Sequence, residues 1–347
     1  LSSALALRRA GIEVAAIIEH AATAIGPQSL VDALAADGVP LLAGRALRRA
    51  EGGADGVAAV VVAQTDVDGR PLPESDTRIA CDTIVTGIGA VPVIELFDAA
   101  GCRIAFRPER GGHVPLTDAG HRTTLPFLYA VGDCAGVWPG KTLDPCLAQT
   151  EGRRAATDAA ASLGRVVRRP SAAAPIPDEP GYDLCAYRLG WVRSAVIEAA
   201  AERGTEPHVC QCEEVTASEI LELRPPRYLG WPSSRRNAND LRARLGEGPP
   251  NPDQVKRLTR AGMGFCQGRR CREQVAALLA LAAGVPLAEV PLASYRAPVR
   301  PLPLGLAADL AERDSMAAHW EAWFGMPSQW LAPWEIEAGG AEGVAGK

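Results

Sequence analysis

The 347-residue sequence predicts an α/β fold that is followed by a small, mostly α-helical domain. Three observations support this prediction. A helix leads directly into an apolar strand at the start of the chain, a second apolar strand ends in Gly132-Asp133, and two short cysteine motifs lie late in the chain among short helices. Alternation of helix and strand patterns is typical of a parallel sheet with helices packed on it.

The first element is a helix at residues 1–10, which Gly11 ends. Residues 12–18 are almost continuously apolar, which predicts a fully buried parallel strand. A helix that feeds directly into such a strand is the second half of a βαβ unit. Because the first strand and its Gly-rich turn are not in the sequence, and because the chain begins at Leu1, we expect a truncated or processed chain.

A strand meander follows this unit. Residues 29–36 predict a short helix, and residues 39–42 predict a strand. Residues 57–64 and 77–84 predict two strands around a turn at 66–71, where an Asp-Gly pair supplies the positive φ angles of a hairpin.

Composition and charge exclude several classes of function. The net charge is −5, the pI is about 5.7 and no long basic run occurs, which argues against nucleic acid as the partner. The apolar stretches are shorter than the roughly 20 residues of a membrane-spanning helix. No signal peptide is visible, so we expect a cytoplasmic, reducing location. The nine cysteines are then expected to bind metal or to be small buried side chains, not disulfides.

The first candidate site motif is the segment 83–92, which reads Thr-Ile-Val-Thr-Gly-Ile-Gly-Ala-Val-Pro. Its two glycines, Gly87 and Gly89, allow the backbone to pass close to a cofactor or a crossing strand without a Cβ clash.

The second motif is the segment 124–136. Residues 127–131 predict a short buried strand, and Gly132-Asp133 follows at its carboxyl end, where open α/β sheets bind ligands. A single Gly-Asp pair more often makes only a tight turn. Two motifs in the expected order favour a cofactor site instead.

These two motifs resemble the carboxyl-proximal signatures of the pyridine nucleotide–disulfide oxidoreductase superfamily. The resemblance implies a two-dinucleotide, Rossmann-like FAD/NAD fold in which Asp133 accepts a hydrogen bond from the ribityl chain of FAD. It also implies a contact from Gln149, in a predicted helix at 147–161 whose amino-terminal dipole faces the flavin. The Gly-rich turn for the ADP half of FAD and the redox dithiol of the disulfide reductases are both missing from the sequence.

Glu19, which ends the first predicted strand, is a candidate contact for a nicotinamide ribose. A solvated charge at a strand end is an equally good interpretation. If a dinucleotide binds, Glu19 favours NAD over NADP, because a 2′-phosphate would be repelled.

The four cysteines of the late motifs are candidate metal ligands: Cys210, Cys212, Cys266 and Cys271. The C-x-C and C-x4-C spacings allow each pair to come from one loop. A capping box at 216–219 begins a helix after the first pair, and residues 272–283 form a helix after the second. Four thiolates suit either a [2Fe–2S] cluster or a structural Zn²⁺ ion.

This stretch resembles the [2Fe–2S] domain of bacterioferritin-associated-ferredoxin-like proteins, although its two pairs are further apart than in small stand-alone members. That resemblance favours the cluster, beside which Arg269 and Arg270 add positive charge. The five other cysteines are expected to be small buried side chains: Cys81, Cys102, Cys134, Cys146 and Cys185.

The chain divides into five predicted segments. They are a partial NAD(P)-binding-like domain with a meander (1–80), the carboxyl part of an FAD domain (81–164), a linker (165–205), the cluster domain (206–284), and a Pro-rich segment with an aromatic tail (285–347). The tail carries four tryptophans that are candidates for a subunit interface.

The order of these segments resembles the flavoprotein α or A subunits of heteromeric amino-acid and amine dehydrogenases, of the hydrogen cyanide synthase, opine oxidase and hydroxyproline dehydrogenase type. The resemblance implies a partner flavoprotein subunit that oxidises the substrate, and a chain that passes the electrons through FAD and [2Fe–2S]. It implies no catalytic base on this chain. The alternatives are an NAD(P)H-dependent flavoprotein reductase and a zinc-stabilised interaction module.

Overall fold

The structure is a computed structural model that describes residues 1–138, 140–141, 144–165, 184–197, 207–230, 240–295 and 299–318. It divides into two compact units, Leu1–Val299 and Arg300–Lys347. The predicted linker lies mostly outside the described residues, and so does the aromatic tail beyond residue 318. The five predicted segments remain predictions.

The first unit begins with the predicted helix, strand, helix and strand. They are α1 (Ser2–Arg9), β1 (Ile17–Ile18), α2 (Gln28–Ala36) and β2 (Leu41–Leu42). Both helices were predicted within two residues, and β1 and β2 are parallel as predicted. The buried strand at 12–18 was wrong in extent, because only two residues pair and Ile12 is exposed. The small core here is made by Leu5, Leu34 and Val39.

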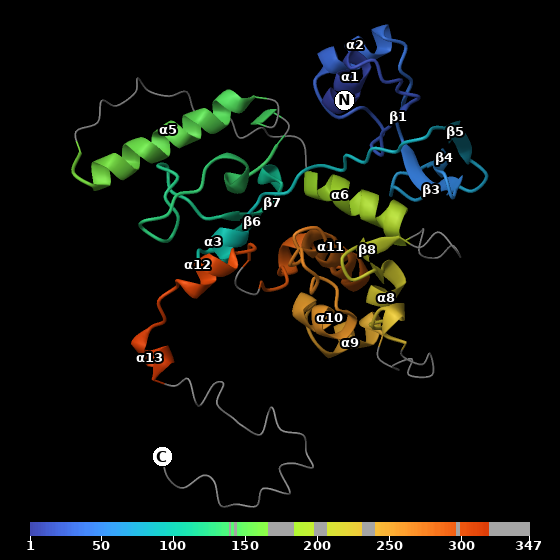
Figure 1. Cartoon of the computed structure of the whole chain (residues 1–347). Coiled ribbons are helices and arrows are strands. Elements are labelled where there is room, and N and C mark those ends of the chain that lie inside the picture. The colour runs from blue at the N-terminus through green and yellow to red at the C-terminus, as the bar shows by residue number, and fades with distance from the viewer. Residues whose placement is uncertain are drawn as a thin grey trace, which may run out of the picture. The chain divides into compact units, whose positions relative to one another are not determined.

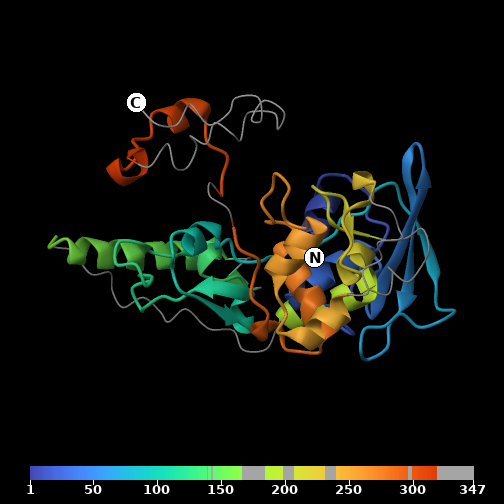
Figure 2. The ribbon, with the colours of Figure 1, turned by 90° about the horizontal axis from the view of Figure 1, so that it is seen from below.

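A three-stranded antiparallel sheet follows. Its strands are β3 (Arg45–Gly53), β4 (Gly56–Gln64) and β5 (Thr77–Ala80). The β4–β5 hairpin was predicted, and Gly69 in its turn has a φ of +78°. Strand β3 was not predicted. It forms a long hairpin with β4 (Figure 2). Residues 59–63 of β4 are buried.

The middle of the chain has little regular strand structure. Its elements are α3 (Glu95–Ala99), β6 (Ile104–Arg107), β7 (Gly112–Pro115) and the long helix α5 (Pro145–Ser162). The predicted buried strand at 127–131 is not formed. Only Tyr129 makes a bridge, to Arg122, and Phe127 is 78% exposed.

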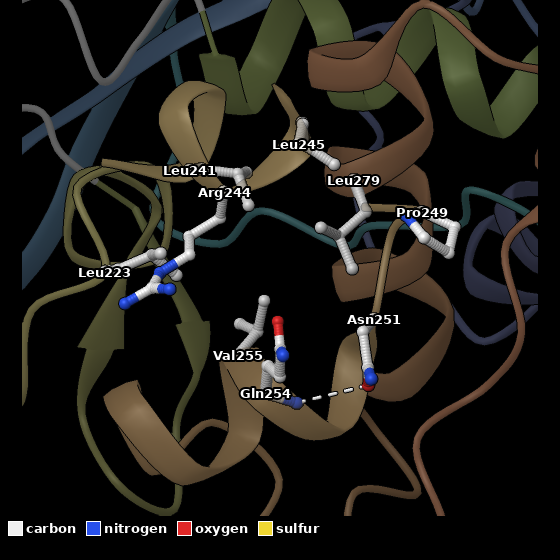
Figure 3. Close-up of a pocket in the computed structure, with 9 residues that line it drawn as sticks. All are labelled: Leu223, Leu241, Arg244, Leu245, Pro249, Asn251, Gln254, Val255 and Leu279. Carbon is white, nitrogen blue, oxygen red and sulfur yellow. Dashed lines mark hydrogen bonds between the residues drawn. The ribbon is translucent and has the colours of Figure 1, made fainter. Parts of the chain in front are cut away.

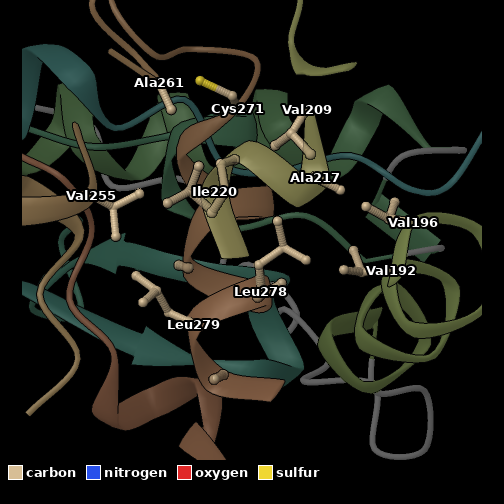
Figure 4. Close-up of a cluster of buried hydrophobic side chains, with 14 of the residues drawn as sticks. Val192, Val196, Val209, Ala217, Ile220, Val255, Ala261, Cys271, Leu278 and Leu279 are labelled. Carbon is tan, nitrogen blue, oxygen red and sulfur yellow. The ribbon is translucent and has the colours of Figure 1, made fainter. Parts of the chain in front are cut away.

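The late part of the first unit is helical around one two-stranded ribbon. Its elements are α6 (Leu184–Val192), a π-helical turn (Arg193–Ile197), β8 (His208–Cys210), β9 (Val215–Thr216), α8 (Ala217–Leu221), α9 (Leu241–Glu247), α10 (Pro252–Thr259) and α11 (Arg272–Ala283). Figure 1 shows α9 and α10 grouped around α11. The fully buried Leu278 and Leu279 of α11 pack with Ile220 and Val255 (Figure 4).

In its described residues, 300–318, the second unit has two short helices, α12 (Leu304–Ala308) and α13 (Asp314–Ala317), and none of their side chains is buried. In the part of the chain that the structure describes, no helix is both long and apolar enough to cross a membrane.

Candidate functional site

The four candidate metal ligands come together although their motifs lie far apart in the sequence. Cys210 ends strand β8, and Cys212 lies in the turn that follows it. Cys266 and Cys271 lie in the turns before α11, for which Cys271 is the N-cap residue. The structure pairs the thiols of Cys210 and Cys271 by a hydrogen bond, and those of Cys212 and Cys266 by another.

The two cysteines of each motif come from one loop region, as expected, but the hydrogen bonds run between the two motifs. Each hydrogen-bonded pair joins one thiol from the β8–β9 turn to one from the turns before α11. Two glycines make the approach of the loops feasible. The Gly262 N–H donates to the Cys210 sulfur at 3.4 Å, and a Cβ on Gly264 would lie 2.5 Å from the Cys212 Cβ. The loops therefore interlock through positions that have no side chain.

The surroundings of the thiols lower the pKa of one member of the buried pair and raise that of the other. The hydrogen bond from Cys271 lowers the pKa of the Cys210 thiol to about 6, although burial opposes this effect. The same hydrogen bond, together with burial, raises the pKa of Cys271. Cys210 and Cys271 are each 1% exposed, whereas Cys212 is only partly buried. One buried pair thus favours a single thiolate that its neighbour stabilises.

The turn after Cys212 is held by a network of carboxylates. Glu213 accepts hydrogen bonds from the hydroxyl of Tyr228 and the Nε of Arg260, both at 2.7 Å. The predicted capping box is present, because the Thr216 hydroxyl accepts the Glu219 N–H and the Glu219 carboxylate accepts the Thr216 N–H. Helix α11 also has its predicted bounds, and Gly284 ends it with a φ of +66°.

Among the described residues, no group of three or more His, Cys, Asp or Glu side chains is arranged to hold a metal ion. The thiols instead form the two pairs described above. No disulfide links the nine cysteines. Of the five that were expected to be buried, Cys102 and Cys185 are, Cys81 and Cys134 are partly buried, and Cys146 is exposed on the first turn of α5, so that expectation was wrong for Cys146.

The first glycine motif lies on the surface. Gly87 and Gly89 are exposed, and Gly89 has a φ of +92°, a conformation that favours glycine. A Cβ on Gly87 would meet no atom within 4 Å. The backbone carbonyl of Ala90 accepts a hydrogen bond from Arg188 of α6 at 3.2 Å. The segment therefore leaves an open backbone surface at both glycines.

The second motif contains a buried ion pair that sequence reasoning missed. Lys141 and Glu151 are both 3% exposed, and Lys141 Nζ lies 2.8 Å from Glu151 Oε1. Glu151 Oε2 accepts the Gly132 N–H, and Lys141 Nζ donates to the Gly132 carbonyl, both at 2.6 Å. Both polar groups of the Gly132 backbone are thus fixed by one ion pair. The only signal in the sequence is a lone lysine after an apolar run.

Asp133 follows this clamped glycine and is exposed. Its carboxylate has no hydrogen-bond partner among the residues that the structure describes. Gln149 is also exposed, in the first half of α5, whose N-cap Asp144 accepts the Cys146 N–H. The protein therefore holds Gly132 rigidly while it leaves Asp133 and Gln149 open to solvent.

Glu19 is partly buried and has hydrogen-bond partners of its own. It lies at the end of β1, and its Oε1 accepts the Ala21 N–H at 3.0 Å. Its carboxylate also bonds to Tyr187 of α6, and burial followed by the charge of Glu19 raises the pKa of that tyrosine. The ring of His20 lies edge-on to Tyr187, with centroids 6.0 Å apart.

Two small cavities lie in the helical part. One is lined by residues of α9, α10 and α11 (Figure 3) and has a volume of about 10 Å³. That volume holds about one water molecule, so the cavity is a packing gap and cannot accept an organic substrate. The other, also about 10 Å³, lies beside Cys271.

Comparison with known proteins defines the class of this chain. Residues 1–161 match the family described as pyridine nucleotide-disulphide oxidoreductase, and residues 236–310 match the sarcosine oxidase A3 domain. The chain is therefore similar to the pyridine nucleotide-disulphide oxidoreductases over its first 161 residues and to the sarcosine oxidase A3 domain over a later segment.

The chain is also similar to relatives of known description. The chain is 30% identical over 248 residues to the A-type subunit of opine oxidase from Rhizobium meliloti (strain 1021), a match that covers 70% of this chain and 47% of the relative. It is 26% identical over 288 residues to HcnB, a hydrogen cyanide synthase subunit of Pseudomonas protegens, and this match covers 76% of this chain and 55% of the relative. The chain spans about half the length of these relatives.

The fold is also similar to a solved structure, the L-proline dehydrogenase from P. horikoshii. The TM-score is 0.51 at 18% identity, and the match covers 86% of this chain and 49% of that chain. The α/β fold predicted from the sequence is thereby confirmed.

Proposed function

We propose that this chain is the electron-transferring part of a heteromeric amine or amino-acid dehydrogenase. A partner flavoprotein subunit oxidises the substrate, and this chain passes the electrons through FAD and a [2Fe–2S] cluster. The cofactor contacts on this chain are Gly87, Gly89, Gly132, Asp133 and Gln149 for the flavin. The cluster ligands are Cys210, Cys212, Cys266 and Cys271. We expect this reaction in the cytoplasm, where thiols stay reduced.

The convergence of the four thiols is the observation that carries the proposal. A [2Fe–2S] cluster takes two thiolates for each of its irons, so four sulfurs in two adjacent pairs suit it. The loop passes so close to Cys212 at Gly264 that only glycine fits there. The Gly262 N–H already donates to the sulfur of Cys210, one of the proposed ligands. Such N–H groups stabilise the negative charge of a cluster. The four thiols therefore supply the type and number of donors that a [2Fe–2S] cluster takes, although they form two hydrogen-bonded pairs in this structure.

The residues of the second motif fit a flavin. Asp133 offers a free carboxylate to a ribityl hydroxyl, and its backbone position is fixed because Lys141 and Glu151 clamp Gly132. The exposed glycines of the first motif leave the backbone accessible to a ring system. When bound, FAD supplies the exchange between two-electron and one-electron chemistry, while the protein only binds and orients it.

The role of a partner flavoprotein is supported by the relatives. Both are described as subunits, one of an oxidase and the other of a synthase. No side chain in either motif is a credible general base, so the carbon–hydrogen bond of the substrate is broken elsewhere. Glu19 remains the candidate contact for a nicotinamide ribose, and its carboxylate is also bonded to Tyr187.

Metal analysis of the purified chain tests the cluster. We expect about two irons and two labile sulfides per chain after anaerobic reconstitution, with the visible absorption of a [2Fe–2S] centre. Cys212→Ser and Cys266→Ser should each abolish the colour, whereas the exposed Cys146→Ser serves as the matched control and should keep it. One equivalent of zinc without iron would contradict the proposal and favour the interaction module.

Reduction assays test the source of electrons. The complex with its partner should reduce the cluster when the amine substrate is added. Reduction of the isolated chain by NADH alone would favour the NAD(P)H-dependent reductase instead.

A further inference from the structure

A buried arginine lies directly beside the proposed cluster. Arg272 follows Cys271 as the first residue of α11 and is only 5% exposed. Its guanidinium carbon lies 3.4 Å from the centroid of the Tyr295 ring, and its Nη2 lies 3.2 Å from Oδ2 of Asp98 on α3. A full positive charge is thus held in a place that water scarcely reaches.

Two of its three guanidinium nitrogens have unused hydrogens. Nε and Nη1 of Arg272 are buried and have no hydrogen-bond partner among the described residues. A buried donor that lacks an acceptor costs free energy, and more so when it is charged. Native proteins rarely leave such groups unmet, so an acceptor is expected in the space that these nitrogens face.

The cavity at this position is bordered by the thiol loops. Arg272 lines it together with Cys271, Gly262 and Gly268. A Cβ on Gly268 would lie 2.9 Å from the Arg272 side chain, so the loop and the arginine are in close contact. Gly262 is the residue whose N–H points at the Cys210 sulfur. Arg272 therefore lines the same small space as one of the four cysteines, Cys271, and as the glycine that donates to another, Cys210.

Arg270 provides a contrast within the same loop. It adjoins Cys271 on the other side, but it is exposed and its Nη1 donates to the Gln211 side chain at 2.9 Å. Water and salt screen an exposed charge strongly and a buried charge weakly. Two arginines that flank one ligand thus differ in how strongly they act on it.

We propose that Arg272 sets the reduction potential of the cluster and that Asp98 moderates its effect. This inference rests on the proposed function. A bound cluster would gain one negative charge when it takes up one electron. The buried guanidinium stabilises the added charge and raises the potential, while the Asp98 carboxylate partly neutralises the guanidinium. Hydrogen bonds and nearby charge are known determinants of cluster potentials.

A redox titration of the whole chain, loaded with its cluster and followed by electron paramagnetic resonance, tests this proposal. Arg272→Met should lower the equilibrium constant of reduction at least tenfold, which for one electron is a shift of about 59 mV to lower potential. Arg272→Lys should retain most of the potential. The matched control Arg270→Met should shift it much less, and Asp98→Asn should raise it.

The opposite signs for Arg272→Met and Asp98→Asn are the sharpest part of the test, because loss of packing at one ion pair would not move the potential in two directions. Each variant is first checked for unchanged iron and sulfide. If Arg272→Met does not load, a raised potential in Asp98→Asn still supports the proposal and an unraised one overturns it. If loaded Arg272→Met has an unchanged potential, or the same potential as Arg270→Met, the proposed role of Arg272 is wrong. The proposed cluster would not be affected by that result. A wild-type chain that takes up no iron would instead contradict the proposed function.

Discussion

The helical region around α11, which bears the four candidate cysteines, differs in how it is built from the glycine-motif region, which comprises the motifs at 83–92 and 124–136 and helix α5. In the helical region, α11 is buried along most of its length, and the thiol loops lock into one another. In the glycine-motif region, the first motif is mostly exposed, the second is mostly buried or partly buried, and the predicted strand at 127–131 is not formed. The first region therefore derives its order from a continuous apolar core, and the second depends on a few polar interactions.

The two regions should be sensitive to different kinds of substitution. A core loses stability when apolar volume is removed, while a polar framework loses it when one partner of a buried charge is removed. Substitutions in each region therefore test whether the two regions depend on different interactions.

The largest effect is expected at the Lys141–Glu151 pair. Lys141→Met leaves the Glu151 carboxylate buried without its cation, which should lower the free energy of unfolding by about 3–5 kcal/mol. Urea unfolding measures the change. The double variant Lys141→Met/Glu151→Leu should lose clearly less, because no charge is then left unpaired. A double variant that is as unstable as the single one would show that packing, and not charge, holds Gly132.

The next effect is expected in the core of the helical region. Leu279 is fully buried in α11, and Leu279→Ala should cost about 2–5 kcal/mol through lost burial and the cavity that remains. Leu163 after α5 is 77% exposed, so Leu163→Ala is the matched control and should change stability by less than about 0.5 kcal/mol. Equal effects at the two leucines would remove the contrast between the regions.

The same contrast explains what the sequence could predict. The capping box at Thr216 and the bounds of α11 were predicted because caps and helix periodicity are local signals. The strand at 127–131 was wrong, because a strand needs hydrogen bonds from a partner that its own residues do not reveal. The Lys141–Glu151 pair was also missed, since ten residues separate its members and neither has a motif.

The four thiols illustrate a partial success. Their spacing and flanking helices predicted one site, and the structure brings the four side chains together. The pairing across loops was not predicted, because it depends on the close approach of Gly264 to Cys212. Arg272 was missed as well, since an arginine at the start of a helix gives no sign in the sequence that it is buried.

A smaller effect is expected at the capping box. Thr216→Ala removes the acceptor for the Glu219 N–H and should lower stability by about 0.5–2 kcal/mol. Thr216→Ser keeps the hydroxyl and should therefore restore most of the lost stability. The Glu219 carboxylate also accepts the Arg227 N–H at 3.1 Å, and neither variant removes that bond. Thermal unfolding of both variants measures this. A serine variant as unstable as the alanine one would show that the methyl group matters and the cap does not.

The smallest effect is expected at Asp158, which ties the segment around Tyr129 to α5. Its Oδ2 accepts hydrogen bonds from Arg122 Nε at 3.0 Å and from the Tyr129 hydroxyl at 2.9 Å. These bonds, with that of Arg122 first, lower the pKa of Asp158 below its ordinary value of 3.8. A carboxylate with a lowered pKa stabilises the fold above its unfolded value, and this contribution disappears as the pH falls through the folded value.

Asp158→Asn should therefore be less stable than the wild type at neutral pH, by less than Thr216→Ala, and the difference should shrink below about pH 3.8. Because the pair is open to solvent, salt should also reduce the difference. Urea unfolding across this pH range measures the difference in stability. The control is Asp55→Asn, because Asp55 is exposed in a turn. A deficit in Asp158→Asn that stays constant down to the lowest pH would mean that the asparagine disturbs packing. The glycine-motif region would then depend on shape as much as the helical region does.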